Sequence, residues 1–164
     1  FLAPTSETGL GACVPVLRAT KKGGGGEGGK RDGEAGGGGR GGGADGAIAQ
    51  AGRRDLTLAR RALPILDSPQ QSTRCFPGDA VVTCAGGHLR TDFVIHAVGP
   101  DYRRCHSGYT QADADKTLYA AYLASMRQAR ELGAGTIGFT LLSAGVYRGS
   151  RSFLGVLFDV FRKI

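Results

Sequence analysis

The chain has 164 residues with a formal net charge of +7, and 29 of its residues are glycine. This length predicts a single domain that buries a sizeable core. No apolar run approaches the length of a membrane span, so we expect no membrane partner. Four cysteines occur without a recognisable secretory leader and without a paired zinc-ligand spacing. We therefore expect reduced thiols, no metal, and a cytoplasmic or nuclear protein.

Glycine is concentrated near the N-terminal end, because more than half of the glycines lie between Gly23 and Gly46. Glycine at this density raises the entropy cost of ordering the chain, so residues 21–40 are predicted to be a flexible insertion. Residues 1–20 form an uncertain N-terminal strand region, since Pro15 reduces the apolar run at 12–17 to an edge strand at most. The folded domain is expected over residues 41–164.

The first segment with a clear helical pattern is 44–66. Asp45 stands where an N-cap or first-turn acid is favourable, Gly52 is placed to divide the helix in two, and Pro64 falls near its end. The apolar face is expected to comprise Ile48, Leu56, Ala59 and Leu63.

Two strands are predicted next, at 79–84 and 92–98, because both segments are β-branched and apolar and turn-forming glycines lie between them. The clearest helix is 111–133. Its apolar residues recur at helical spacing and are Leu118, Tyr122, Met126, Ala129 and Leu132. Residues 136–142 predict a strand covered on both faces, and residues 151–164 predict a last helix.

Helices that separate apolar strands predict an α/β fold with three layers, α/β/α, around a central mixed sheet. Ligands of such sheets bind beyond the carboxyl ends of the strands. Two glycine-containing turns, at 41–46 and 143–147, each precede a predicted helix. Glycine allows backbone N–H groups to approach a ligand closely, so two such turns facing each other could hold a diphosphate. Each turn taken singly is better explained as a structural turn at a helix start.

Asp45 and Tyr147 each have two interpretations at this point. The Asp45 carboxylate either caps a helix or accepts hydrogen bonds from sugar hydroxyls and acts as a general base on a water. Tyr147 is either a half-buried core aromatic or a ring that packs on a sugar.

Three blocks of the sequence can be compared with known motifs. They are "GGGADGAIAQAGR" from residue 41, "FPGDAVVTCAGGHLRTDFVIHAVGP" from residue 76 and "TIGFTLLSAGVYRGS" from residue 136. Together they resemble the macro domain. They occur in the family's order over residues 41–150. The resemblance implies a macro-like domain that is degenerate or truncated at both ends, lacks outer strands, and binds ADP-ribose or mono-ADP-ribosylated proteins. ADP-ribose would be its ligand or product, and no cofactor is implied.

The resemblance also implies site residues. Those of the first loop, near the distal ribose and its phosphate, are Gly41, Gly42, Gly43, Gly46 and Ile48. Those of the second loop, which would hold the diphosphate through backbone N–H groups, are Ser143, Ala144, Gly145 and Val146. Tyr147 would pack on the distal ribose. Asp45 matches the family's catalytic aspartate, which positions or activates a water. His96, in the family's "VIH" strand, is interpreted as structural.

Three functions stay open. The first is hydrolysis of mono-ADP-ribosyl esters or O-acetyl-ADP-ribose with Asp45 acting on a water. The second is a non-catalytic ADP-ribose reader or inactive remnant, because the family's "N-A-A-N" strand end has no match and Thr20 is the nearest candidate for its last asparagine. An acidic residue that would read the adenine is not found either.

The third function is RNA binding by the glycine-rich segment, which with Arg40 resembles RGG tails. Residues 23–46 carry three basic and four acidic residues and no aromatic ones, which argues against a nucleic-acid partner.

Overall fold

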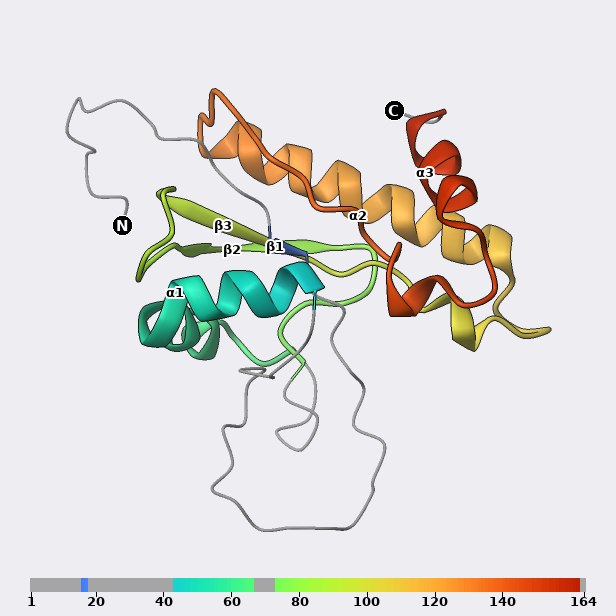
Figure 1. Ribbon diagram of the computed structural model, residues 1–164, viewed down its shortest axis with the longest axis horizontal. Coiled ribbons are helices and arrows are strands. Elements are labelled where there is room, and N and C mark those ends of the chain that lie inside the picture. The colour runs from blue at the N-terminus through green and yellow to red at the C-terminus, as the bar shows by residue number, and fades with distance from the viewer. Residues whose placement is uncertain (1–15, 18–42, 67–72, 163–164) are drawn as a thin grey trace, which may run out of the picture.

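The computed structural model describes residues 16–17, 43–66 and 73–162 (Figure 1). The N-terminal region apart from Val16–Leu17, the predicted insertion at 21–40, and Thr20, Gly41 and Gly42 lie outside the described residues. The elements in chain order are β1 (Val16–Leu17), α1 (Gly43–Ala62), β2 (Ala80–Cys84), β3 (Phe93–Ala97), the 3₁₀ helix η1 (Tyr102–Arg104), α2 (Gln111–Glu131), the 3₁₀ helix η2 (Val146–Arg148) and α3 (Phe153–Phe161).

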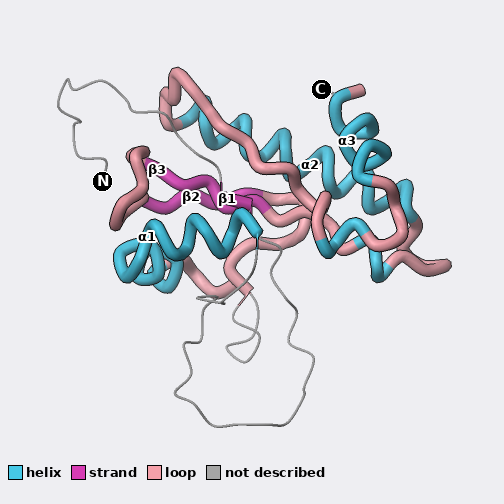
Figure 2. The backbone as a smooth tube through the Cα atoms, in the orientation of Figure 1, coloured by secondary structure: helices cyan, strands magenta, loops and turns pink. Residues whose placement is uncertain are grey.

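The sheet in the described part of the chain has the strand order β1-β3-β2 and is mixed. Strand β1 runs parallel to β3, with Val16 opposite His96, and β2 runs antiparallel to β3, with Val82 opposite Ile95. Helix α1 covers one face of this sheet and α2 covers the other, as Figures 1 and 2 show. The predicted three-layer α/β/α arrangement with a central mixed sheet is confirmed.

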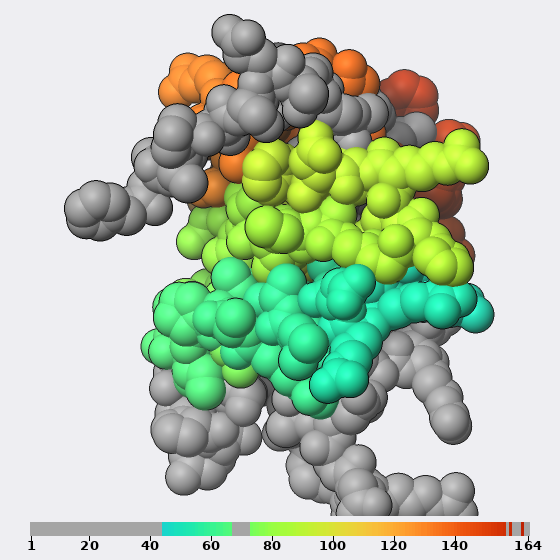
Figure 3. All heavy atoms as spheres, turned by 90° about the vertical axis from the view of Figure 1, so that its left-hand side faces the viewer, coloured from blue at the N-terminus to red at the C-terminus, as the bar shows by residue number. Residues whose placement is uncertain are grey.

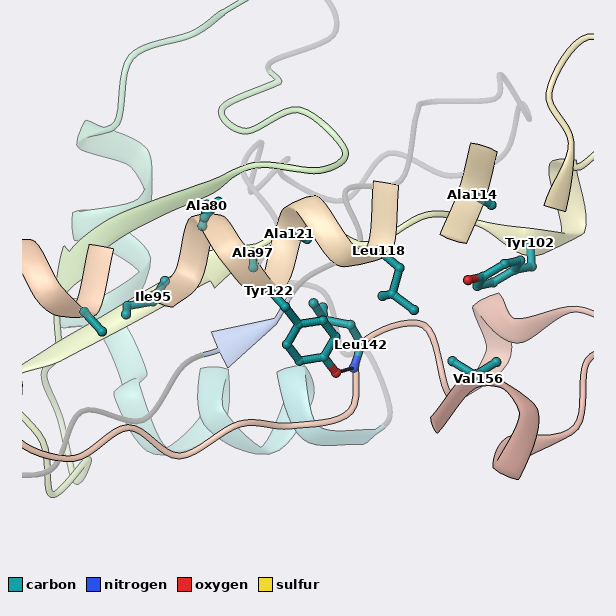
Figure 4. Packing of buried hydrophobic residues seen from close by; sticks show 12 residues of the cluster. Ala80, Ile95, Ala97, Tyr102, Ala114, Leu118, Ala121, Tyr122, Leu142 and Val156 are labelled. Carbon is teal, nitrogen blue, oxygen red and sulfur yellow. Dashed lines mark hydrogen bonds between the residues drawn. The ribbon is translucent and has the colours of Figure 1, made fainter. Parts of the chain in front are cut away.

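Side chains of β3 alternate between two cores, as the period of two in a strand requires. Ile95 and Ala97 face α2, where they join the larger core, while Val94 packs with Leu56 of α1. The larger core is drawn in Figure 4. It comprises Ala80, Ile95, Ala97, Tyr102, Ala114, Leu118, Ala121, Tyr122, Ala124, Ala129, Leu142 and Val156.

Helix α2 begins where its sequence specifies. The Thr110 side chain accepts from the Asp113 backbone N–H and the Asp113 carboxylate accepts from the Thr110 backbone, which is a complete capping box. The predicted apolar face is wrong at Met126, which is 47% exposed. At 3.6 residues per turn Met126 lies about 80° around the helix from Leu118. The buried stripe instead includes the small residues Ala121 and Ser125.

The prediction of a fully covered strand at 136–142 is wrong. In the described part of the chain this segment contains a single β-bridge residue, Ile137, and no longer strand, and Phe139 and Leu141 are exposed. This segment packs along α2. The Leu142 backbone N–H donates to the Tyr122 hydroxyl at 3.0 Å (Figure 4), and the Phe139 ring centroid lies 5.4 Å from that of Tyr122. An apolar run of this length fits a central strand buried on both faces, but it fits equally well an extended segment that buries one side on a helix, because the composition does not say what covers the run.

The other predicted elements are confirmed, with small shifts at their ends. The strands predicted at 79–84 and 92–98 are β2 and β3, and the helix predicted at 151–164 is α3, Phe153–Phe161. In the described ranges no helix is long and apolar enough to cross a membrane. The same residues contain no group of three or more His, Cys, Asp or Glu side chains suited to a metal ion.

Candidate functional site

The first predicted loop leads directly into α1. Gly43 is the first residue of the helix, Asp45 lies in its first turn, and Gly46 is half-buried. Ile48 packs against the core formed by Leu56 and Val94, so its side chain is part of that core. The expectation that Asp45 occupies a first turn is therefore met, and its negative charge lies at the helix end that favours it.

The Asp45 carboxylate forms an ion pair with a buried arginine of the same helix. Arg60 Nη2 donates to Asp45 Oδ1 at 3.0 Å, and Arg60 is only 6% exposed. Fifteen residues of straight α-helix would separate the two positions by about 22 Å. The pair exists because α1 bends sharply at Arg53, whose φ of 50° and ψ of −144° are not helical. The predicted division at Gly52 thus occurs one residue later.

The bend in α1 is fixed by the loop that joins β2 and β3. The Gly87 N–H donates to Asp55 Oδ2 at 3.0 Å, and the His88 N–H donates to the Ala51 carbonyl at 2.7 Å. Gly87 has a φ of +60°, and a Cβ there would lie 2.4 Å from the Ala51 oxygen. Only glycine permits this close approach. Figure 3 shows α1, in teal, lying against the yellow-green residues of the hairpin.

The second predicted loop begins with a residue in the left-handed region. Ser143 has a φ of 55°, which is uncommon for a residue other than glycine, and its Oγ donates to the Pro100 carbonyl at 2.7 Å. Gly99 makes room for this contact, because a Cβ there would lie 2.5 Å from the Ser143 Oγ. Loop 143–147 is therefore held by the loop that follows β3.

The amide groups of loop 143–147 are the feature that points to a ligand. Within the described residues, the N–H groups of Ala144, Gly145, Val146 and Tyr147 donate to no protein acceptor. Gly145 and Val146 are exposed, and a Cβ on Gly145 would meet nothing within 4 Å. Several successive unbonded amides beside a glycine form a typical site for an anion. The turn itself is closed by the Arg148 N–H, which donates to the Gly145 carbonyl at 3.1 Å.

Tyr147 is half-buried and lies beneath an arginine from the loop after β3. The Arg103 guanidinium carbon is 4.9 Å from the Tyr147 ring centroid. Arg103 also donates from Nε and Nη2 to the two carboxylate oxygens of Asp101, at 2.8 and 2.7 Å. This hydrogen bonding lowers the pKa of Asp101. Loop 143–147 and the start of α1 both lie toward the right-hand end of the sheet in Figure 1.

His96 has the structural role expected of it. It is buried in β3, and its Nε2 lies 2.8 Å from the Thr83 Oγ1 of β2. A hydrogen bond between two buried side chains on neighbouring strands satisfies polar groups that would otherwise be costly to bury.

Residues 33–152 match the family model of the macro domain, which is most of the chain. The chain belongs to the macro domain family. This confirms the family that the three sequence blocks indicated. The match begins inside the segment interpreted as an insertion, so part of that segment aligns with the family.

Two curated relatives are similar to part of the chain. An O-acetyl-ADP-ribose deacetylase of Enterobacter sp. (strain 638) is 44% identical over 78 residues, which are 48% of this chain and 40% of the relative. A macro domain-containing protein of Caldanaerobacter subterraneus subsp. tengcongensis is 37% identical over 90 residues, which are 52% of this chain and 48% of the relative. Each match spans less than half of the relative's length.

The solved structures support the fold. The Oceanobacillus iheyensis macrodomain with ADP superposes with a TM-score of 0.62 at 20% identity, covering 92% of this chain and 65% of that chain. A mutant of the same macrodomain with ADPR gives a TM-score of 0.60 at 23% identity, covering 74% of this chain and 60% of that chain. The macro fold of this chain is thus shown by both sequence and structure.

Three residues next to the predicted site were not expected from the sequence: Arg60, Asp101 and Arg103. Arg60 reaches Asp45 only because α1 bends, and Arg103 reaches Tyr147 across 44 positions of sequence. The basic residues at 60 and 61 fit a solvated helix face equally well. A local pattern carries no signal for contacts of this kind.

Proposed function

We propose that this macro domain binds ADP-ribose, free or attached to a protein, with its diphosphate on loop 143–147. The observation that supports this most is the run of four amide groups, from Ala144 to Tyr147, that donate to no acceptor in the described residues. A diphosphate offers several charged oxygens at the spacing of successive backbone amides, and charge-assisted hydrogen bonds to them are stronger than neutral ones.

The two loops would divide the ligand between them. Asp45 is a poor neighbour for phosphates, because like charges repel. Its carboxylate is suited to sugar hydroxyls, which can donate to it. Oδ1 of Asp45 is held by Arg60, so the direction of the carboxylate is set by the protein. We therefore assign the diphosphate to loop 143–147 and the distal ribose to the space between Asp45 and Tyr147.

Titration calorimetry with three ligands tests this assignment. ADP-ribose contains both the diphosphate and the distal ribose, ADP contains only the diphosphate, and AMP contains neither. We expect ADP-ribose to bind most tightly, ADP more weakly and AMP most weakly. Absence of binding at millimolar ADP-ribose would refute the proposal, and equal affinities for ADP-ribose and AMP would refute the place given to the diphosphate and distal ribose.

A second candidate function is hydrolysis of an acyl ester on the distal ribose, as in O-acetyl-ADP-ribose. It is favoured by Asp45 in the first turn of α1 and by the name of the relative from Enterobacter. A water oriented by Asp45 would attack the acyl carbon, and the bond between that carbon and the ribose oxygen would break. The ribose oxygen takes up a proton, and the products are a carboxylic acid and ADP-ribose.

The activity is tested by release of acetate from O-acetyl-ADP-ribose. Asp45→Asn keeps the size of the side chain and an oxygen for Arg60, so loss of turnover with retained ADP-ribose affinity supports hydrolysis. Unchanged turnover in Asp45→Asn would refute a role for this carboxylate. A wild-type protein that binds ADP-ribose and releases no acetate is a reader. The RNA-binding alternative concerns residues outside the described part and stays a prediction.

A further inference from the structure

We infer that Arg103 is a positioning residue that fixes the ring of Tyr147 and thereby makes the site selective for ligands with a distal ribose. This inference rests on the proposed binding of ADP-ribose. It follows from the contacts of Arg103, which belongs to none of the three blocks that indicate ADP-ribose binding by resemblance.

Arg103 would ordinarily be a mobile surface side chain, since its side chain is 49% exposed. Two parallel hydrogen bonds to Asp101 remove that freedom, because a bidentate pair defines the plane of the guanidinium. Asp101 is itself fixed, with a side chain that is 17% exposed and an Oδ1 that accepts from the Arg103 backbone N–H at 3.1 Å. The hydrogen bonds from Arg103 also lower the pKa of Asp101, so this carboxylate, which is charged at neutral pH in any case, stays charged further into the acidic range.

The guanidinium fixed in this way lies over the Tyr147 ring at 4.9 Å from its centroid. A cation over the face of an aromatic ring is attracted by the electron-rich face, and arginine prefers a stacked arrangement. Tyr147 is half-buried and follows two exposed residues, Gly145 and Val146, and in the described part of the chain its ring lies against the Arg103 guanidinium. Arg103, which belongs to η1, orients the Tyr147 ring from outside the loop.

The segment that carries Arg103, from Pro100 through η1, contacts loop 143–149 at two further points. Ser143 Oγ donates to the Pro100 carbonyl at 2.7 Å. Gly149, with a φ of +62°, lies so close to Tyr102 that a Cβ would be 3.2 Å from the Tyr102 carbonyl carbon. Tyr102 also contacts α2, because its hydroxyl donates to Asp115 Oδ1 at 2.7 Å. The backbone beside Arg103 is thus held by contacts with both loop 143–149 and α2.

A fixed ring can pack on a sugar without first losing conformational entropy, which is the benefit of preorganisation. The gain applies only to ligands that place a sugar against the ring. Arg103 should therefore affect ADP-ribose, whose distal ribose reaches Tyr147, and leave ADP unaffected. Arg104 provides a matched control, because its Nε lies 3.5 Å from Asp101 Oδ2 and its side chain is 57% exposed.

The test is calorimetry of wild-type protein, Arg103→Gln and Arg104→Gln with ADP-ribose and with ADP, after thermal melts show that all three fold. We expect Arg103→Gln to weaken ADP-ribose about three- to thirty-fold, the range of a cation–π contact, with ADP changed less than about twofold. Arg104→Gln should change neither ligand. In a Tyr147→Ala background, Arg103→Gln should have no further effect on ADP-ribose.

Three results would overturn the inference. Unchanged or tighter ADP-ribose binding by Arg103→Gln would show that the arginine does not position the ring for the ribose. Equal weakening of ADP-ribose and ADP would show a general charge effect. Equal losses of ADP-ribose affinity in Arg103→Gln and Arg104→Gln would also show a general charge effect. Wild-type protein that binds neither ligand contradicts the proposed function itself, and that outcome is distinct from these three.

Discussion

Arg60 Nη2 and Asp45 Oδ1 lie 3.0 Å apart, which joins the two halves of a bent helix through the carboxylate that the family resemblance makes catalytic. The pair therefore has a structural role whether or not Asp45 acts on a water. Substitutions at Asp45 are therefore expected to change stability as well as any binding or turnover in which the carboxylate takes part. Stability has to be measured before any loss of binding or turnover is interpreted.

Asp45→Ala should lower the free energy of unfolding by about 1–3 kcal/mol, because it leaves the buried Arg60 charge without this partner. Asp45→Asn should cost less, because the amide oxygen can still accept from Arg60. Urea unfolding monitored by circular dichroism measures both. Arg54→Gln, on the same helix at an exposed position, is the control and should change stability by less than about 0.5 kcal/mol. Equal stability of Asp45→Ala and wild type would contradict the role given to the ion pair.

Arg53 and Arg54 should respond in opposite directions to glycine. Arg53 has a φ of 50° and a ψ of −144°, a region adopted almost only by glycine, and Arg53→Gly should stabilise the protein by about 1 kcal/mol. Arg54 continues the helix, and Arg54→Gly should destabilise it by about 1 kcal/mol. The measurement is the melting temperature of each variant compared with wild type, which should rise for Arg53→Gly and fall for Arg54→Gly. A lower melting temperature for Arg53→Gly would contradict the bend in α1.

Alkaline pH should destabilise the protein through Cys75. Burial raises the pKa of this thiol from 9.0 to about 12, with a smaller contribution from the Asp79 charge. Between these values the unfolded chain has lost the proton that the folded protein retains, so unfolding gains a favourable term and stability falls as the pH rises. Denaturant midpoints measured from pH 8 to pH 11 should decrease, and Cys75→Ala should decrease less steeply. Parallel pH profiles for the two proteins would exclude Cys75 as the cause.

The same burial should determine which thiol reacts. Cys75 is buried and Cys84 is exposed. Because the thiolate is the reactive form, a maleimide or iodoacetamide at pH 8 should label Cys84 well before Cys75 in the folded protein. Peptide mass spectrometry of a time course gives the order. Labelling of Cys75 at the rate of Cys84 would mean that β2 and the turn before it open readily.

Much of the fold could be predicted because its signals are local. The apolar period of α2 and the β-branched runs of β2 and β3 each depend on residues that are close in sequence. The segment at 136–142 could not be assigned correctly, because its partner is Tyr122 on α2, and an apolar run does not say whether it meets a strand or a helix. Whether such a run becomes a strand depends on the tertiary packing around it.

The candidate site likewise contains residues that a local motif predicts and contacts that only the tertiary structure brings together. Gly145 and Tyr147 were predicted as ligand-binding residues by the motif that contains them, and the structure places both in one loop with amides that donate to no protein acceptor in the described part. The ion pair of Arg60 and the contact of Arg103 with Tyr147 depend on a bend and on two loops meeting, which no spacing encodes. The roles of all these residues in binding stay predictions.

The central claim, that loop 143–147 holds the diphosphate of ADP-ribose, is tested most directly by calorimetry of Gly145→Ala. A Cβ at Gly145 meets nothing within 4 Å in the protein itself, and the same is true of the exposed Gly138 outside the loop. Gly138→Ala should therefore melt like wild type. Gly145→Ala creates no clash, but the backbone of Gly145, with φ −89° and ψ −130°, lies outside the regions that alanine prefers, so its melting temperature is measured before its affinity is interpreted. We predict that Gly145→Ala weakens ADP-ribose binding tenfold or more, since the methyl group occupies the space in which a diphosphate approaches the amides, and that Gly138→Ala binds like wild type. Equal ADP-ribose affinity in wild type and Gly145→Ala would contradict the claim.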